Sequence, residues 1–142
     1  MSSMRGFLIV LLVACGLGAS AADKVVNIGL FWNNEPSEVT VQTSLGNYSI
    51  YGNGKLILDL KESTIVRILN QDGLIQVRTI TQDLGTFYNV EIKRTVWGSS
   101  LKIQPKGDKE LHEYNDNFIF KPFQGKLRIV NEVYIEHYVA GV

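Results

Sequence analysis

Apolar and polar residues alternate along many short segments of the chain, and turn residues separate these segments. Alternation with a period of two is typical of strands that bury one face. Asn53-Gly54 is the strongest turn signal, because both residues accept the positive φ angles of a type I′ hairpin turn. Asn70 to Gly73 predicts a second hairpin. The predicted strands span residues 25–31, 39–43, 48–51, 56–60, 65–69, 74–80, 90–94, 101–103, 118–120 and 127–130, the last two flanking Gln124-Gly125.

This pattern predicts a mainly β fold built from short antiparallel strands and hairpins. No stretch between Asp23 and Asn131 has helical periodicity. The chain has 142 residues, of which 45% are hydrophobic and 10% aromatic, enough for one domain with a core and too apolar for a disordered chain. Residues 106–117 are polar and charged, so we expect this loop to be the most flexible insertion.

The pattern changes after Asn131. Apolar residues then recur at helical spacing, which predicts a short C-terminal helix. Asn131 would be its N-cap, and Glu132 and Glu136 would complement the positive end of the helix dipole. These apolar residues form one stripe of the predicted helix, and the stripe continues to the last residue given. We therefore expect the chain to be the N-terminal portion of a larger α+β fold. The stripe consists of Ile135, Tyr138, Val139 and Val142.

The first residues are typical of an export signal. Arg5 precedes an apolar run over 7–13, and small residues follow, so residues 1–21 predict a secretory signal and 22–142 the mature domain. The run is short for a membrane span. A second interpretation remains open: residues 12–15 resemble a lipoprotein box, which would end the signal at residue 14 and place a lipid on Cys15. In either case the protein is exported, and it meets a membrane only through the signal or the lipid.

Charge and composition exclude several functions. The chain has 14 basic and 14 acidic residues, and removing the signal takes away only Arg5, which leaves no excess to neutralise nucleic-acid phosphates. One cysteine excludes an internal disulfide and a cysteine-built zinc site. His112 and His137 have no metal-ligand spacing, so we predict no metal and no other cofactor. Asn115 to Asn117 resembles part of a calcium loop, but without its glutamate it predicts an Asx turn.

The segment from Gln124 to Val142 resembles the signature of the stage II sporulation protein D and amidase-enhancer family. That signature is a glycine-led strand, then Val-Asn-x-(Val/Leu), then Leu-Glu-x-Tyr-(Leu/Val)-x-Gly-Val. Residues 25–50 are similar to the family's first strands, so the resemblance brackets nearly all of the mature chain. Tyr134 stands where the family often has proline, and therefore lacks proline's preset φ for a helix start. The motif residues singled out here are Asn131, Glu132, Glu136, Tyr138 and Gly141.

The resemblance implies an exported bacterial cell-wall protein. Its sporulation branch implies a lytic transglycosylase that acts on peptidoglycan glycan strands, and its other branch implies a protein that enhances a cell-wall amidase. The family's catalytic glutamate follows Gly-Val by a few residues, whereas this sequence stops at Val142. Glu136 matches a different, non-catalytic glutamate. No catalytic residue is therefore assigned, and whether sporulation is involved stays open.

Several residues have two interpretations. Glu132 and Glu136 form either a carboxylate pair for glycoside chemistry or a helix cap. Six aromatic residues either stack on sugars or pack in the core. Two alternatives to the transglycosylase stay open for the protein as a whole. It is a non-catalytic module that binds peptidoglycan or enhances an amidase, or it is a plain structural β domain of a secreted lipoprotein. The aromatic residues are Trp32, Trp97, Tyr48, Tyr51, Tyr134 and Tyr138.

Overall fold

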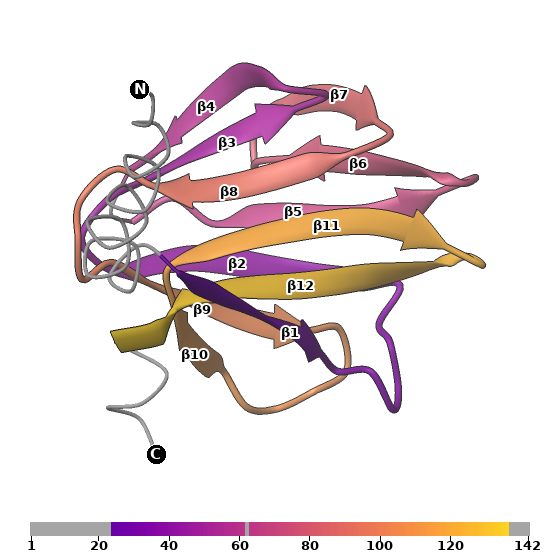
Figure 1. The fold of residues 1–142 in the computed structure, drawn as a ribbon. Coiled ribbons are helices and arrows are strands. Elements are labelled where there is room, and N and C mark those ends of the chain that lie inside the picture. Colours follow the sequence, from indigo (N-terminus) through magenta and orange to yellow (C-terminus); the bar gives the residue numbers. More distant parts are fainter. Residues whose placement is uncertain (1–23, 62, 137–142) are drawn as a thin grey trace, which may run out of the picture. The chain divides into compact units, whose positions relative to one another are not determined.

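A computed structural model describes residues 24–61 and 63–136 of the chain (Figure 1). These residues form two antiparallel sheets of six strands, which confirms the mainly β prediction. One sheet has the order β1-β12-β11-β8-β3-β4 and the other the order β10-β9-β2-β5-β6-β7. The strands are β1 (Val25–Leu30), β2 (Glu38–Leu45), β3 (Tyr48–Gly52), β4 (Lys55–Leu60), β5 (Val66–Gln71), β6 (Leu74–Arg78), β7 (Asp83–Phe87), β8 (Val90–Arg94), β9 (Ser100–Pro105), β10 (His112–Asn115), β11 (Asn117–Phe123) and β12 (Lys126–Tyr134).

The described residues belong to two compact units. The larger unit, residues 27–132, holds the hydrophobic core, to which both sheets contribute. The smaller unit combines residues 24–26 with residues 133–136, and in it the Ile135 N–H donates a hydrogen bond to the Lys24 carbonyl over 3.0 Å. No helix within residues 24–61 and 63–136 has the length and apolar character needed to cross a membrane.

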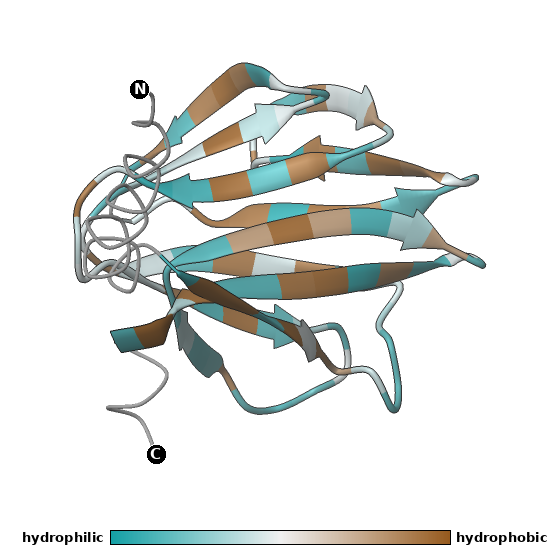
Figure 2. Cartoon of the chain, in the orientation of Figure 1, coloured by the Kyte–Doolittle hydropathy of each residue, from teal (hydrophilic) through white to brown (hydrophobic). Residues whose placement is uncertain are grey.

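The core of the larger unit follows from the alternation along the strands. Figure 2 shows apolar and polar residues taking turns along most strands. Val39 and Val41 of β2 point inward from one sheet, and Phe118 and Phe120 of β11 from the other, each at most 1% exposed. Burying such a side chain contributes roughly 1.5–3 kcal/mol, so one unbroken row of inward residues fixes the register of a strand.

Three turns of type I′ geometry connect neighbouring antiparallel strands. The central φ angles are +50° and +84° at Asn53-Gly54, and +53° and +89° at Asp72-Gly73. They are +52° and +78° at Gln124-Gly125. These turns join β3 to β4, β5 to β6 and β11 to β12, which confirms the hairpins predicted from the sequence.

The loop expected to be flexible contains a strand. Within residues 106–117, β10 pairs with β9, with His112 opposite Ile103 and Tyr114 opposite Leu101. Tyr114 is half-buried and packs against the core. Strand β7 was also not predicted, because its sequence mixes a charge, a glycine and a threonine with its apolar residues. Neither strand has a strong alternation of apolar and polar residues. Pairing with β9 stabilises β10, and pairing with β6 stabilises β7.

The predicted C-terminal helix is not seen, and its predicted start is wrong. Strand β12 runs through Asn131 and Glu132 to Tyr134, with buried residues at every second position. Asn131 is therefore a strand residue and not an N-cap. Only Ile135 and Glu136 follow with helical backbone, and residues 137–142 lie outside the described part of the chain. The strand period extends four residues further than expected because pairing with β11 reaches Glu132.

Gly46 lies between β2 and β3, where the chain leaves one sheet for the other. Its φ angle is +72°, and a Cβ atom added there would lie 2.9 Å from the Ser99 Cα atom. Neither the backbone conformation nor the space admits a side chain. Gly54 has a φ angle of +84° but no atom within 4 Å of such a Cβ.

We therefore expect Gly46→Ala to lower the free energy of unfolding by about 2–4 kcal/mol, from strain and overpacking together. Gly54→Ala is the matched control and should cost only about 1 kcal/mol, because it suffers the strain alone. Urea denaturation of the two variants measures the difference. Equal losses would show that the contact with Ser99 does not constrain the β2–β3 connection.

Candidate functional site

Asn115, Asp116 and Asn117 form a sharp corner where the chain passes from β10 in one sheet to β11 in the other. Asp116 has a φ angle of +70° and is fully buried. Aspartate tolerates this left-handed conformation better than most residues. The Asp116 N–H donates to the Ser99 carbonyl over 3.2 Å, which ties the corner to the start of β9. The sequence predicted a turn here, but not its burial.

Side chains from two other strands bind all three carbonyl groups of the corner. The Asn131 Nδ2 atom of β12 donates to the Asn115 carbonyl over 2.7 Å and to the Asn117 carbonyl over 3.0 Å. The Tyr48 hydroxyl of β3 donates to the Asp116 carbonyl over 2.8 Å. Asn131 is 3% exposed, so its amide replaces the water that these carbonyls would otherwise need.

The charge of Asp116 is paired inside the protein. The Arg94 Nε atom lies 3.1 Å from the Asp116 Oδ1 atom, and the Arg94 guanidinium stacks on the Trp97 ring with 4.6 Å to its centroid. The Arg94 N–H also donates to the Asn117 Oδ1 atom over 2.8 Å. Because a buried carboxylate needs a partner, Arg94 occupies the place that a bound cation would take. The corner is therefore a structural clasp, defined here as Tyr48, Arg94, Asp116, Asn117 and Asn131.

Tyr48 is neutral in this clasp. Burial raises the pKa of its hydroxyl well above the ordinary value, and the negative charge of Asp116 raises it further, more than Arg94 lowers it. The hydroxyl consequently keeps its proton and donates it to the Asp116 carbonyl. Of the two interpretations open for Tyr48, the structure supports core packing, since this side chain is 1% exposed.

Glu132 and Glu136 are the other motif residues that the structure describes. Glu132 is half-buried in β12 opposite Asn117, and Glu136 is exposed. Because no helix joins them, neither the capping role nor the paired carboxylates follow from helical spacing. Among residues 24–61 and 63–136 no group of three His, Cys, Asp or Glu side chains is arranged to hold a metal ion. The predicted lipidation residue Cys15, together with His137, Tyr138 and Gly141, lies outside the described residues.

The aromatic residues considered for sugar stacking do not form one platform. Tyr51 is half-buried, with the Lys93 ammonium 5.3 Å from its ring centroid. Trp97 is 50% exposed beside Arg94, in the connection after β8. Trp32 is 74% exposed in the connection after β1. The two tryptophans lie at opposite ends of their sheet, because β1 ends near the start of β12 whereas β8 ends near the clasp.

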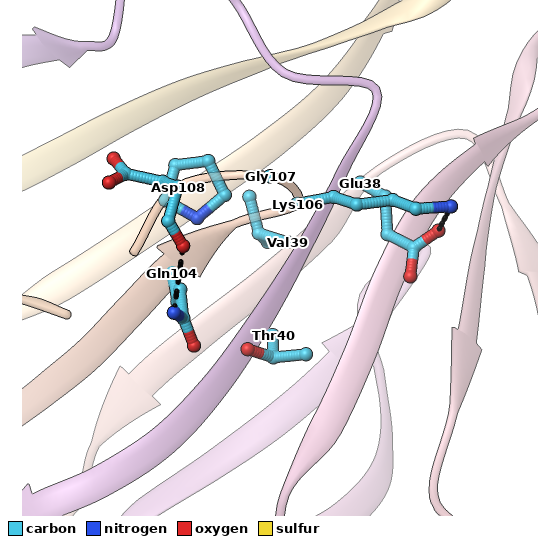
Figure 3. A pocket seen from close by; sticks show the side chains of 8 residues that line it. Glu38, Val39, Thr40, Gln104, Lys106, Gly107 and Asp108 are labelled. Carbon is cyan, nitrogen blue, oxygen red and sulfur yellow. Dashed lines mark hydrogen bonds and ion pairs between the residues drawn. The ribbon is translucent and has the colours of Figure 1, made fainter. Parts of the chain in front are cut away.

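A polar groove of about 610 Å³ lies at the end where Trp32 is found. One wall is the β1–β2 connection, with Phe31 and residues 33–37, and the other is the end of β9 and the connection after it, residues 105–108. Lys126, at the start of β12, completes the lining. A smaller hollow of about 250 Å³ shares residues 105–108 as a wall (Figure 3). We call the larger hollow the loop groove. The sequence missed the loop groove because its lining residues come from three separate parts of the chain.

Two carboxylates, Asp108 and Glu113, have lowered pKa values. The Glu110 N–H and then the His112 ring, 3.0 Å away, lower the pKa of Asp108. Hydrogen bonds from Ser100, 2.6 Å away, and from Ser44 lower the pKa of Glu113. Both groups are more firmly ionised than free carboxylates, whereas an acid that protonates a glycosidic oxygen needs a raised pKa.

Comparison of the chain with protein-family models, with curated proteins and with solved structures found no match. The resemblance to the sporulation and amidase-enhancer family stays a prediction that depends on the residues quoted for it.

We expect Asn131→Ala to lower the free energy of unfolding by about 2–4 kcal/mol, because it leaves the Asn115 and Asn117 carbonyls buried without their donor. Glu132→Gln, at the next position of the same strand, should change it by less than about 0.5 kcal/mol. Chemical denaturation followed by tryptophan fluorescence measures both. A loss below 1 kcal/mol for Asn131→Ala would contradict the role of this amide in the clasp.

The raised pKa of Tyr48 predicts a loss of stability at alkaline pH. The unfolded chain releases the Tyr48 proton near pH 10, whereas the folded chain retains it, so the stabilisation is complete below about pH 10 and falls above it. This loss amounts to at most about 1.4 kcal/mol per pH unit. Tyr48→Phe should be less stable at neutral pH but lose less stability between about pH 10 and 11. Parallel slopes in urea melts of the two proteins would contradict this prediction.

Proposed function

We propose that the chain is an exported cell-wall protein of the sporulation protein D and amidase-enhancer type, directed at the glycan strands of peptidoglycan. In this proposal residues 1–21 direct export, or residues 1–14 do so and Cys15 carries a lipid. The sandwich supplies the framework of the domain and the motif strand. The proposal depends on the motif from Gln124 to Val142 and on the similar opening strands over residues 25–50.

The burial of Asn131 is the observation that carries the proposal. A polar amide on the inward face of a strand is costly unless it is fully hydrogen-bonded. Here both of its bonds go to a corner that this fold needs for crossing between sheets. Because the motif's asparagine has this specific hydrogen-bonding role, a true family motif is favoured over a chance sequence match.

The pKa shifts of the described carboxylates also agree with a role in which this chain does not supply the proton donor for glycan cleavage. Lytic cleavage of a glycan needs a carboxylic acid that is protonated near neutral pH. Asp108 and Glu113 are shifted in the opposite direction. In the resemblance, no residue of this chain matches the family's catalytic glutamate. We therefore expect this chain to bind peptidoglycan without cleaving it.

The prediction is tested with residues 22–142 and purified peptidoglycan sacculi. We expect the protein to sediment with the sacculi and to release no anhydro-muropeptides, measured by chromatography of the soluble fraction. Insoluble cellulose serves as the control for nonspecific sedimentation. Release of anhydro-muropeptides would place a catalytic acid within this chain and contradict the assignment.

A parallel assay separates the binding role from the enhancer role. The protein is added to a cell-wall amidase acting on the same sacculi, and the release of stem peptides is followed. Faster release would identify the amidase-enhancer branch. If the protein neither sediments with sacculi nor accelerates an amidase, the proposal fails, and a plain structural β domain remains.

A further inference from the structure

The loop groove combines the groups that recognise sugars. Asn33 and Asn34 contribute side-chain amides, each with donors and an acceptor that suit neighbouring hydroxyls. Phe31 contributes an aromatic residue to the same lining. Aromatic rings next to planar amides offer a surface for the C–H face of a sugar and partners for its hydroxyls.

The charges of the loop groove balance. Its lining has two carboxylates, Glu35 and Asp108, and two ammonium groups, Lys106 and Lys126. Glu35 accepts a bond from the Arg128 Nε atom over 2.9 Å, and Lys106 lies 3.8 Å from Glu38. A lining of this kind has no net field to attract a polyphosphate or a nucleic acid. It suits a polar ligand of low charge, with many hydroxyl and amide groups.

The walls of the loop groove are held in place before a ligand arrives. The Leu127 N–H donates to the Pro36 carbonyl over 2.7 Å, and the Lys106 N–H donates to the Glu38 carbonyl over 2.9 Å. The Gln104 Nε2 atom donates to the Asp108 carbonyl over 2.9 Å, as Figure 3 shows. Each loop is thus fixed to a strand of the sandwich, which lowers the entropy that binding would cost.

Phe31 adds strain at the same place. Its φ angle is +55°, a conformation that a bulky side chain rarely adopts. Its ring packs edge-on against His112 at 5.4 Å and against Tyr114 at 6.2 Å, measured between ring centroids. These contacts hold the aromatic residue at the edge of the groove despite the unfavourable backbone. Strain that the surrounding structure maintains is typical of functional positions.

We propose that the loop groove is a non-catalytic subsite for an N-acetylated glycan chain. This inference rests on the proposed function and adds where on the sandwich the glycan binds. Its volume of about 610 Å³ is within the range of small-ligand sites. Lys126 and Asn131 are five residues apart on β12, or roughly 16 Å, so the subsite is separate from the clasp.

The test uses residues 22–142, labelled with ¹⁵N, and chitotetraose as the soluble probe. We expect chitotetraose to shift the backbone amide resonances of residues 33–35, 106–108 and Lys126 and to leave those of the clasp unchanged. The double variant Asn33→Ala/Asn34→Ala should weaken chitotetraose binding at least about fivefold, because it removes two amides from the lining. Tyr88→Ala is the matched control, since Tyr88 is 73% exposed on the β7–β8 connection, and it should bind as the wild type does.

Sedimentation of the same variants with sacculi separates this inference from the proposed function. If the wild type and the Asn33→Ala/Asn34→Ala variant sediment equally and chitotetraose shifts no groove resonance, the subsite is refuted while the cell-wall function stands. If chitotetraose binds in the groove but sacculi do not retain the protein, the subsite stands and the cell-wall function fails. Equal weakening by Asn33→Ala/Asn34→Ala and by Tyr88→Ala would also refute the subsite.

Discussion

The fold depends on the buried corner between β10 and β11, where the chain changes sheets. Three successive carbonyl groups and a carboxylate turn inward there, and each would destabilise the core without a partner. Asn131, Tyr48 and Arg94 supply those partners from three different strands. One polar cluster thereby joins both sheets at a place where apolar packing alone could not satisfy the backbone. Its geometry also fixes the end of β12, the strand that carries the motif.

Strands with a strong pattern and type I′ turns could be predicted because their information is local. Alternation places Val39, Val41, Phe118 and Phe120 inward, and Asn53-Gly54 adopts the φ angles that its residue types favour. Strand β10 could not be predicted in this way, because its short polar sequence becomes a strand only beside β9. The predicted helix failed for the same reason. The residues from Asn131 to Tyr134 follow the predicted strand directly, and pairing with β11 as far as Glu132, with β1 as the other neighbour of β12, extends the strand through them.

The candidate sites could be predicted even less well, because their residues come from distant parts of the sequence. The sequence singled out Asn131 but gave it a capping role, because its partners at Asn115 and Asn117 come from another strand. It gave no sign that Arg94 and Asp116 form a pair, since each is an ordinary residue at the end of its own segment. The loop groove was equally hidden. Asn33 and Asn34 lie far in sequence from residues 105–108, and only the fold brings the two segments into one groove.

The neighbouring positions of β1 and β12 have a consequence for biogenesis. These are the first and last described strands, and they lie side by side in one sheet. The sheet therefore stays incomplete until almost all of the described chain has been synthesised, and until then β11 has an unpaired edge that invites intermolecular association. Such nonlocal pairing also makes folding slow. A helper protein that shields the unpaired edge of β11 would therefore raise the yield of folded protein.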